Sequence, residues 1–132
     1  AEGGCQAETG SAASMTAAAL VALRGGSPAQ TLDAAAIAIK NILGLVCDPV
    51  AGLVECPCIK RNAIGAVNAV LAADMALAGI PSLIPFDETV TAMKSVGRAM
   101  NGDLRETARG GLAATPTGQR IRSELGFSGN ER

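Results

Sequence analysis

Stretches of small apolar residues that alternate with glycine and proline constrain the fold of this chain more than any other feature. In the clearest, residues 63–78, apolar side chains recur every three or four positions, which is the spacing of one face of a helix. That stripe consists of Ile64, Val67, Leu71, Met75 and Ala78. Gly79 and Pro81 follow it and end the helix. We expect a long, buried helix here.

The same spacing predicts a helix over residues 11–23, after an irregular glycine-rich start, and another over residues 31–43. Their apolar faces carry Met15, Ala18, Ala19 and Ala22 in the first helix and Leu32, Ala35, Ile39 and Ile42 in the second. Ser27 and Pro28 are a start signal for the second helix. A serine side chain can accept from the free amides of a first turn, and proline suits the first helical position.

Three shorter segments complete the pattern. Asp87 is expected to cap a helix with a stripe of Val90, Met93, Gly97 and Met100. Asp103 and Glu106 have the spacing of a capping box and predict a short helix. Thr117 begins a last helical segment, and the polar tail from residue 128 is expected to fray.

The composition narrows the fold class. Apolar residues make up 48% of the chain but aromatic residues only 2%, and there is no Trp, Tyr or His. Small side chains let helices approach closely, and alanine has the highest helix propensity. We therefore predict an all-α fold: one domain over residues 1–132, a compact bundle of about five alanine-rich helices with Gly/Pro-rich loops that carry the cysteines. Without histidine, catalysis would need a metal centre or another segment.

The charge balance excludes two classes of partner. The chain has 11 basic and 12 acidic residues, so it has neither the basic surface that binds nucleic acid nor a polybasic run for an anionic membrane. Residues 63–80 resemble a membrane span, but Asn68 and Asp74 interrupt a segment whose apolarity is mainly Ala and Gly. No secretory signal pattern is present, so a cytoplasmic location is expected.

Four cysteines, Cys5, Cys47, Cys56 and Cys58, are the residues best suited to chemistry. Three of them lie within residues 45–59, whose prolines and glycines break the helical pattern and predict a functional loop. Disulfides are not expected in a reducing cytosol. The residues alone leave three alternatives: buried structural thiols, a zinc site that uses all four cysteines, or an iron–sulfur cluster.

Three motifs resemble the iron–sulfur-dependent L-serine dehydratases. GGCQAETGSAASM is similar to the family's first cluster motif, and CDPVAGLVECPCIKRNAIGAVNA is similar to its second. SVGRAMNGDLRETARGGLAATPTG is also similar, so the resemblance covers nearly the whole chain. It implies that Cys5, Cys47 and Cys58 bind a [4Fe–4S] cluster. Cys56 stands where the family usually has an aliphatic residue.

The resemblance also implies a reaction. L-serine loses water, and the aminoacrylate product hydrolyses to pyruvate and ammonia without pyridoxal phosphate. An iron with an open coordination position would hold the substrate's hydroxyl and carboxylate groups. The competing hypothesis is a non-catalytic helical module with a structural metal site or inert cysteines.

The chain is similar to the C-terminal portion of the family's α subunit or catalytic domain. Its expected partners are therefore L-serine, the remaining N-terminal part of the α domain, and a β subunit or domain. Alone, the chain is predicted to be inactive. The sequence is compatible with a homo-oligomer and does not define the number of copies.

Further residues are expected near the cluster. Arg61 is a candidate for a bidentate clamp on the substrate carboxylate, and Asn62 for a donor to that carboxylate or to a cluster sulfur. Gly3 and Gly4 are expected to let the backbone pass close to the cluster with its N–H groups directed at the sulfurs.

Two flanking features complete the predicted site. Asp48 and Glu55 are expected to cap backbone turns of the cysteine loop. Residues 107–118, TARGGLAATPTG, are expected to close over the site. The methionines at 75, 93 and 100 lie on helical stripes and are expected in the core.

Overall fold

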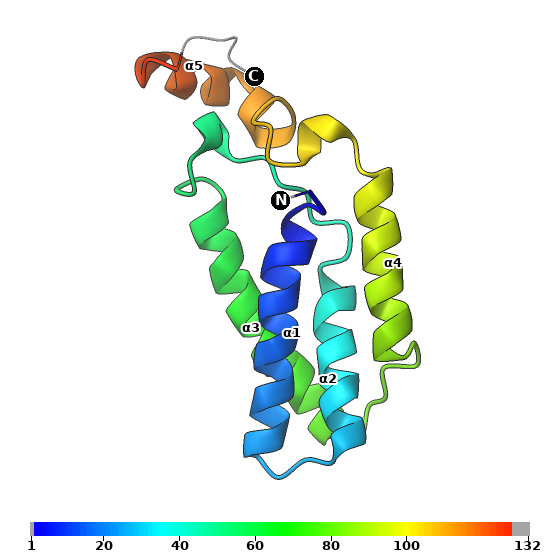
Figure 1. The fold of residues 1–132 in the computed structure, drawn as a ribbon. Helices are drawn as coiled ribbons and strands as arrows, with labels where there is room; N and C mark the ends of the chain where they lie inside the picture. Colours follow the sequence, from blue (N-terminus) through cyan, green and yellow to red (C-terminus); the bar gives the residue numbers. More distant parts are fainter. Residues whose placement is uncertain (1, 128–132) are drawn as a thin grey trace.

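The computed structural model describes residues 2–127. Five α-helices and three short 3-10 helices make up this part of the chain, which contains no β-strand (Figure 1). The α-helices are α1 (Cys5–Leu23), α2 (Pro28–Asn41), α3 (Cys58–Leu77), α4 (Phe86–Ala99) and α5 (Pro116–Glu124), and the 3-10 helices are η1 (Val50–Gly52), η2 (Gly102–Leu104) and η3 (Gly111–Ala114). The all-α prediction is confirmed. The tail from residue 128, predicted to fray, lies outside the described residues.

Helices α1, α2 and α3 pack on one another, and α4 lies against α2 and α1 (Figure 1). Helices α1 and α3 begin at the end of the bundle where α2 and α4 finish, and α5 and η3 lie across that end against η1. All four cysteines therefore belong to one end of the molecule. We call it the cysteine end and define it as residues 2–5, 44–58 and 100–127.

The core is a seam of small side chains between α1, α2 and α3. Its buried members are Ala13, Ala17, Val21, Ala34, Ile37, Ala38, Ala69, Ala72, Ala73 and Ala76. Alanine methyls let the helix axes approach closely, and each buried carbon contributes about 0.8 kcal/mol by removal from water. Many small contacts along three helices replace the few large aromatic contacts of an ordinary core.

The apolar faces predicted for α1 and α3 are wrong. In α3 the large residues Ile64, Val67 and Leu71 are 61%, 69% and 52% exposed, while alanines face the core. In α1, Met15 is 68% exposed. The physical reason is the width of the seam, which admits methyl groups and forces longer side chains outward. Met75, expected in the core, packs against its edge and is only partly buried.

The predicted start of α2 is confirmed and that of α1 is wrong. Ser27 and Gln30 form a capping box, in which each side chain accepts a hydrogen bond from the other residue's backbone amide. Helix α1 begins at Cys5 and not near residue 11. Gly4, in the left-handed region at φ 77°, turns the chain so that the helix starts at the next residue.

Two predicted caps near the end of the chain are also wrong. Helix α4 begins at Phe86, so Asp87 lies inside its first turn. Its negative charge there interacts favourably with the helix dipole, but its side chain forms no capping hydrogen bond. Asp103 and Glu106 form no capping box. The Asn101 side chain accepts from the Asp103 amide instead, and the left-handed φ of 67° at Glu106 prevents helix continuation.

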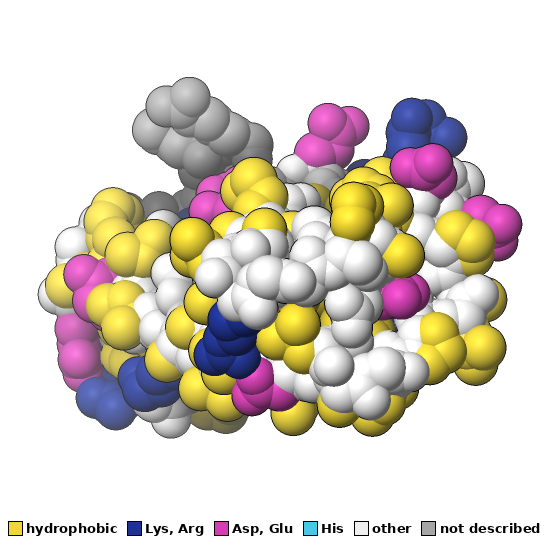
Figure 2. Space-filling view, turned by 90° about the horizontal axis from the view of Figure 1, so that it is seen from below, with side chains coloured by type: hydrophobic (Ala, Val, Ile, Leu, Met, Phe, Trp, Pro, Cys, Tyr) yellow, Lys and Arg dark blue, Asp and Glu magenta, His cyan; other side chains and the backbone are white. Residues whose placement is uncertain are grey.

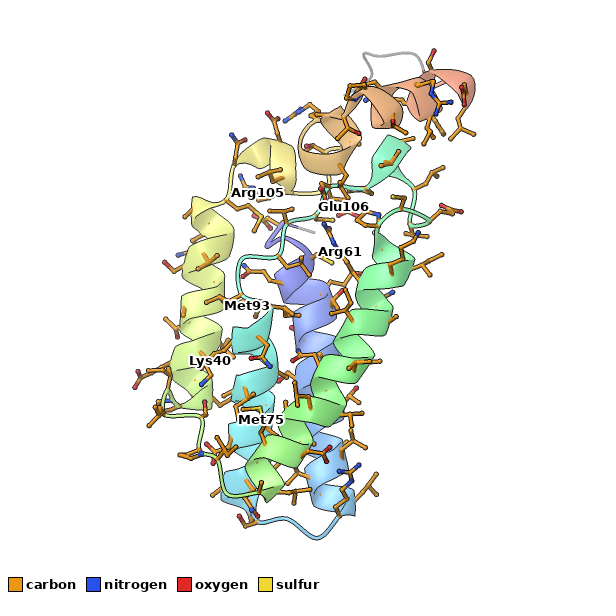
Figure 3. The ribbon with its side chains drawn as sticks, turned by 180° about the vertical axis from the view of Figure 1, so that it is seen from behind. Lys40, Arg61, Met75, Met93, Arg105 and Glu106 are labelled. Carbon is orange, nitrogen blue, oxygen red and sulfur yellow. The ribbon has the colours of Figure 1, made fainter. Side chains whose placement is uncertain are left out.

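No helix within residues 2–127 is long and apolar enough to cross a membrane. Figure 2 views the end opposite the cysteine end, where hydrophobic side chains cover much of the surface and a few charged groups interrupt them. At this end Arg24 pairs with Asp74, whereas Lys40, which Figure 3 labels midway along the bundle, donates to the Ser82 carbonyl.

Candidate metal centre

Three of the four cysteines converge at the cysteine end. Cys5 is the first residue of α1, Cys58 is the first residue of α3, and Cys47 lies in the loop between α2 and η1. The prediction that loops carry these cysteines therefore holds for Cys47, whereas Cys5 and Cys58 occupy helix starts.

The three thiols are close enough for their charges to interact. Burial raises the pKa of Cys47, and the neighbouring Cys5 and Cys58 raise it further because like charges repel. Burial also raises the pKa of Cys58, where Cys5 adds to the shift and Arg61 opposes it. Cys56 is exposed and is not among the groups that shift the pKa of Cys47 or Cys58. Three thiolates so arranged need a shared positive charge.

Backbone bonds to a distant segment hold Cys47. Its amide donates to the Leu104 carbonyl at 2.8 Å, and its carbonyl accepts from the Glu106 amide at 2.8 Å. These bonds form a short parallel bridge opposite Arg105. Figure 3 shows Arg105 and Glu106 beside Arg61 at this end of the bundle. The segment after α4 therefore positions a thiol almost sixty residues earlier in the sequence.

A tight turn holds Cys5. A β-carbon on Gly4 would lie 2.9 Å from the Leu45 carbonyl oxygen and 2.7 Å from Cε of Met100, so no larger residue fits there without displacement. Gly3 similarly faces Gly97 of α4, whose added β-carbon would lie 3.1 Å from the Gly3 Cα. The close approach predicted for Gly3 and Gly4 is thus made, in this structure, to other backbone and to Met100.

The side chain of Gln6 ties this turn to its surroundings. It is 1% exposed. Its Nε2 donates to the carbonyls of Gly3 and Met93 at 3.0 and 2.9 Å, and its Oε1 accepts from the Gly44 amide at 2.9 Å. One amide group therefore joins the start of α1, the middle of α4 and the end of α2, immediately beside Cys5.

Arg61 lies at the site, but its charge is already paired. Its Nη1 donates to Asp48 Oδ1 at 2.7 Å and to the Val46 carbonyl at 2.8 Å. Asp48 is buried, and its second oxygen accepts from the Leu112 amide at 2.7 Å. The amide that Asp48 binds thus belongs to η3 and not to the cysteine loop, whose turn it was expected to cap, and Asp48 joins α3 to the segment expected to close over the site. Glu55 is exposed.

Asn62 is linked to Cys5 through Thr9. The Thr9 hydroxyl lies 3.2 Å from Cys5 Sγ and donates to Asn62 Oδ1 at 3.3 Å. Thr9 and Asn62 also line a cavity of about 390 Å³ between α1 and α3, together with Glu8 and Thr16. Asn62 is exposed, so its amide can reach a small molecule bound in this cavity.

The donor set at the cysteine end has the chemistry of an iron–sulfur site. Thiolates are the usual protein ligands of such clusters, and buried, mutually repelling thiols are suited to one. Among residues 2–127 no group of three or more His, Cys, Asp or Glu side chains is arranged to hold a single metal ion. Ligands to separate irons of one cluster are spaced more widely than the ligands of a single ion.

Two residues of the site were not predicted from the sequence. Gln6 follows Cys5 directly and Thr9 follows it by one helical turn, but the segment was expected to be irregular. A helix that starts at Cys5 would have placed Thr9 on the cysteine's face through the i, i+4 spacing. A polar residue at a fully buried position, such as Gln6, has no sequence signal of its own.

Comparisons with known proteins agree on one family. The family described as "Serine dehydratase alpha chain" matches residues 1–113. The "Probable L-serine dehydratase, alpha chain" of Bacillus subtilis (strain 168) is 62% identical over 125 residues, which are 95% of this chain and 42% of that protein. The "L-serine dehydratase, alpha chain" of Peptoniphilus asaccharolyticus is 61% identical over 125 residues, 95% of this chain and 43% of that protein.

A third relative is a longer protein. The "L-serine dehydratase TdcG" of Escherichia coli (strain K12) is 54% identical over 114 residues, 86% of this chain and 25% of that protein. The chain therefore spans well under two thirds of the length of these relatives. With a family match over most of its length and identities above one half, the chain belongs to the serine dehydratase alpha chain family.

Proposed function

We propose that this chain forms the cluster-binding part of an L-serine dehydratase, which converts L-serine to pyruvate and ammonia with a [4Fe–4S] cluster held by Cys5, Cys47 and Cys58. The observation that carries the proposal is the convergence of these three thiols, each from a different segment, while Cys56 is exposed and is not among the groups that shift the pKa of Cys47 or Cys58. The names of the relatives support the substrate and reaction.

The cluster, when bound, supplies a Lewis acid that helps a hydroxyl group leave. The chain's own residues prepare the place for it. Cys5 and Cys47 are 4% and 5% exposed, so the site excludes bulk water. The starts of α1 and α3 direct partial positive charge at an anionic group bound between them. The helix starts stabilise the negative charge that three thiolates would bring together, whereas burial opposes it, so the bound cluster must supply the compensating positive charge.

Arg61 and Asn62 have different roles in this proposal. A substrate carboxylate at Arg61 would compete with Asp48, so we assign Arg61 mainly to holding the Cys47 loop through the Asp48 ion pair. Asn62, at the edge of the cavity between α1 and α3, is the better candidate for binding the substrate carboxylate. A cytoplasmic, reducing compartment would keep the thiols available.

The remaining part of the α chain is the proposed partner. The 125 residues aligned with the Bacillus subtilis relative are 42% of that protein, so most of its length has no counterpart here. A groove of about 650 Å³ on α3 is lined by Ile64, Val67 and Leu71, with Ile42 and Met75 at its edges. We propose that the N-terminal part of the α chain covers this uncharged groove with apolar side chains. A β subunit or domain is the second proposed partner.

Combining the two parts of the enzyme tests this function. The chain is reconstituted anaerobically with iron and sulfide and mixed with the N-terminal part of the Bacillus subtilis α chain, produced separately, and pyruvate formed from L-serine is measured. Pyruvate is expected from the mixture and from Cys56→Ala, but neither from the chain alone nor from Cys47→Ala. A protein that binds only zinc, or equal pyruvate from Cys47→Ala, would contradict the proposal.

A further inference from the structure

The hydroxyl of Thr9 lies between two groups that compete for its single hydrogen. Thr9 is 6% exposed, and its Oγ1 lies 3.2 Å from Cys5 Sγ and 3.3 Å from Asn62 Oδ1. A hydroxyl donates one hydrogen and accepts through two lone pairs. In the arrangement described here Thr9 donates to Asn62, so the hydrogen between Thr9 and Cys5 is that of the thiol.

Binding of Cys5 to iron reverses this order of donors. An iron-bound thiolate has no hydrogen, so its sulfur can only accept. The Thr9 hydrogen must then turn to Cys5 Sγ, which leaves an Oγ1 lone pair facing Asn62. The Asn62 amide carries both an acceptor oxygen and a donor NH₂, so rotation of that amide presents Nδ2–H to Thr9.

We propose that Thr9 and Asn62 form a relay that positions the Cys5 ligand, in which Asn62 Nδ2–H donates to Thr9 Oγ1 and Thr9 O–H donates to Cys5 Sγ. This inference rests on the proposed function, because it requires Cys5 to bind the cluster. Hydrogen bonds to the ligand sulfurs help set the reduction potential of an iron–sulfur cluster. Each donated bond stabilises the more negatively charged reduced form, so the relay raises that potential.

The packing around Thr9 fixes where its hydroxyl points. A β-carbon on Gly65 of α3 would lie 2.7 Å from the Thr9 methyl, so the absence of a side chain at Gly65 makes room for that methyl. With the methyl seated against α3, the hydroxyl lies beside Cys5 and Asn62. Thr16, further along the same helix, instead donates to the Ala12 carbonyl at 2.9 Å and touches neither group.

The experiment measures the midpoint potential of the reconstituted cluster in the full chain and its variants. Thr9→Val keeps the branched shape and removes the donor, and it is expected to shift the potential to a more negative value. Thr9→Ser keeps the donor but loses the methyl that orients it, so its potential is expected to lie between those of the wild type and Thr9→Val. Thr16→Val is the matched control, since it removes a hydroxyl bonded only to backbone, and it is expected to leave the potential unchanged.

A double-mutant cycle tests the second step of the relay. Asn62→Ala is expected to shift the potential in the same direction as Thr9→Val but by less, and to cause no further shift when Thr9→Val is already present. An intact cluster with unchanged potential in Thr9→Val, or a Thr9→Ser potential equal to that of Thr9→Val, would overturn the relay alone. A wild-type chain that takes up no cluster would overturn the relay and the proposed function together.

Discussion

Asp48 connects more of the candidate site than any cysteine does. Its carboxylate is buried and pairs with Arg61 at 2.7 Å, while its other oxygen accepts from the Leu112 amide at 2.7 Å. Gly111 has a left-handed φ of 58°, and a β-carbon there would lie 2.3 Å from the Asp48 Oδ2. The loop that carries Cys47 and the segment after η2 are therefore joined at one side chain.

Replacing Asp48 by asparagine should destabilise the protein. The substitution leaves the Arg61 charge without its partner, on a side chain that is only 15% exposed, and breaking a buried ion pair costs about 3–5 kcal/mol. The free energy of unfolding is measured by urea titration. The matched control is Asp103→Asn, which breaks a pair with Arg109 whose side chains are 50% and 56% exposed and should change stability by less than about 0.5 kcal/mol. Equal effects of the two substitutions would show that Asp48 does not hold the site.

For individual residues, the sequence predicted which side chains lie at the candidate site but not which hydrogen bonds and ion pairs they form. The cysteines, Arg61 and Asn62 were identified from local motifs, which a sequence displays directly. Leu112, one partner of Asp48, lies 64 residues away along the chain, and Met93, one partner of Gln6, lies 87 residues away, so these two bonds follow only from the packing of helices. No local pattern contains that information.

At the level of elements, alanine determines both the helices and their spacing. Helices α1, α2 and α3 meet mainly through alanine methyl groups, with Val21 and Ile37 as the larger members of the seam, and most of the other large apolar residues of α1 and α3 are exposed. Helical periodicity predicted where α2 and α3 run because apolar residues recur at the right interval in both. It could not predict the buried face, because a rule that places the largest apolar residues inside fails when the core is formed mainly by alanine.

Enlarging an alanine in the seam should therefore cost much more than enlarging one outside it. Ala17 of α1 is fully buried, and Ala17→Leu would overpack the seam at a cost of about 1–3 kcal/mol. Ala19, two residues later on the same helix, is exposed, and Ala19→Leu should change stability by less than about 0.5 kcal/mol. Thermal unfolding of both variants compares the two faces directly. A stabilised Ala17→Leu would mean that the seam is looser than described.

At the level of the whole molecule, much apolar surface is uncovered. The groove on α3 is lined mainly by apolar side chains, and large exposed apolar patches mark interaction sites. A charge placed there should leave the isolated chain folded and weaken its association with the N-terminal part of the α chain. Leu71→Asp is expected to raise the dissociation constant of that complex at least about tenfold, which corresponds to about 1.4 kcal/mol.

The control for this prediction is Leu83→Asp. Leu83 is 87% exposed in the loop before α4, away from the groove, and aspartate tolerates its left-handed φ better than leucine does. Isothermal titration of both variants with the separately produced partner measures the difference. Similar affinities for the two variants would place the partner elsewhere on the molecule.

The iron and sulfide content of the anaerobically reconstituted chain, measured with one cysteine removed at a time, tests the three proposed ligands directly. Cys58→Ala should lose the cluster, as should Cys5→Ala and Cys47→Ala, because these thiols converge at one end of the bundle. Cys56→Ala should retain the full iron and sulfide content, because this thiol is exposed and is not among the groups that shift the pKa of Cys47 or Cys58. A cluster that survives Cys58→Ala and disappears in Cys56→Ala would contradict the assignment of the three ligands.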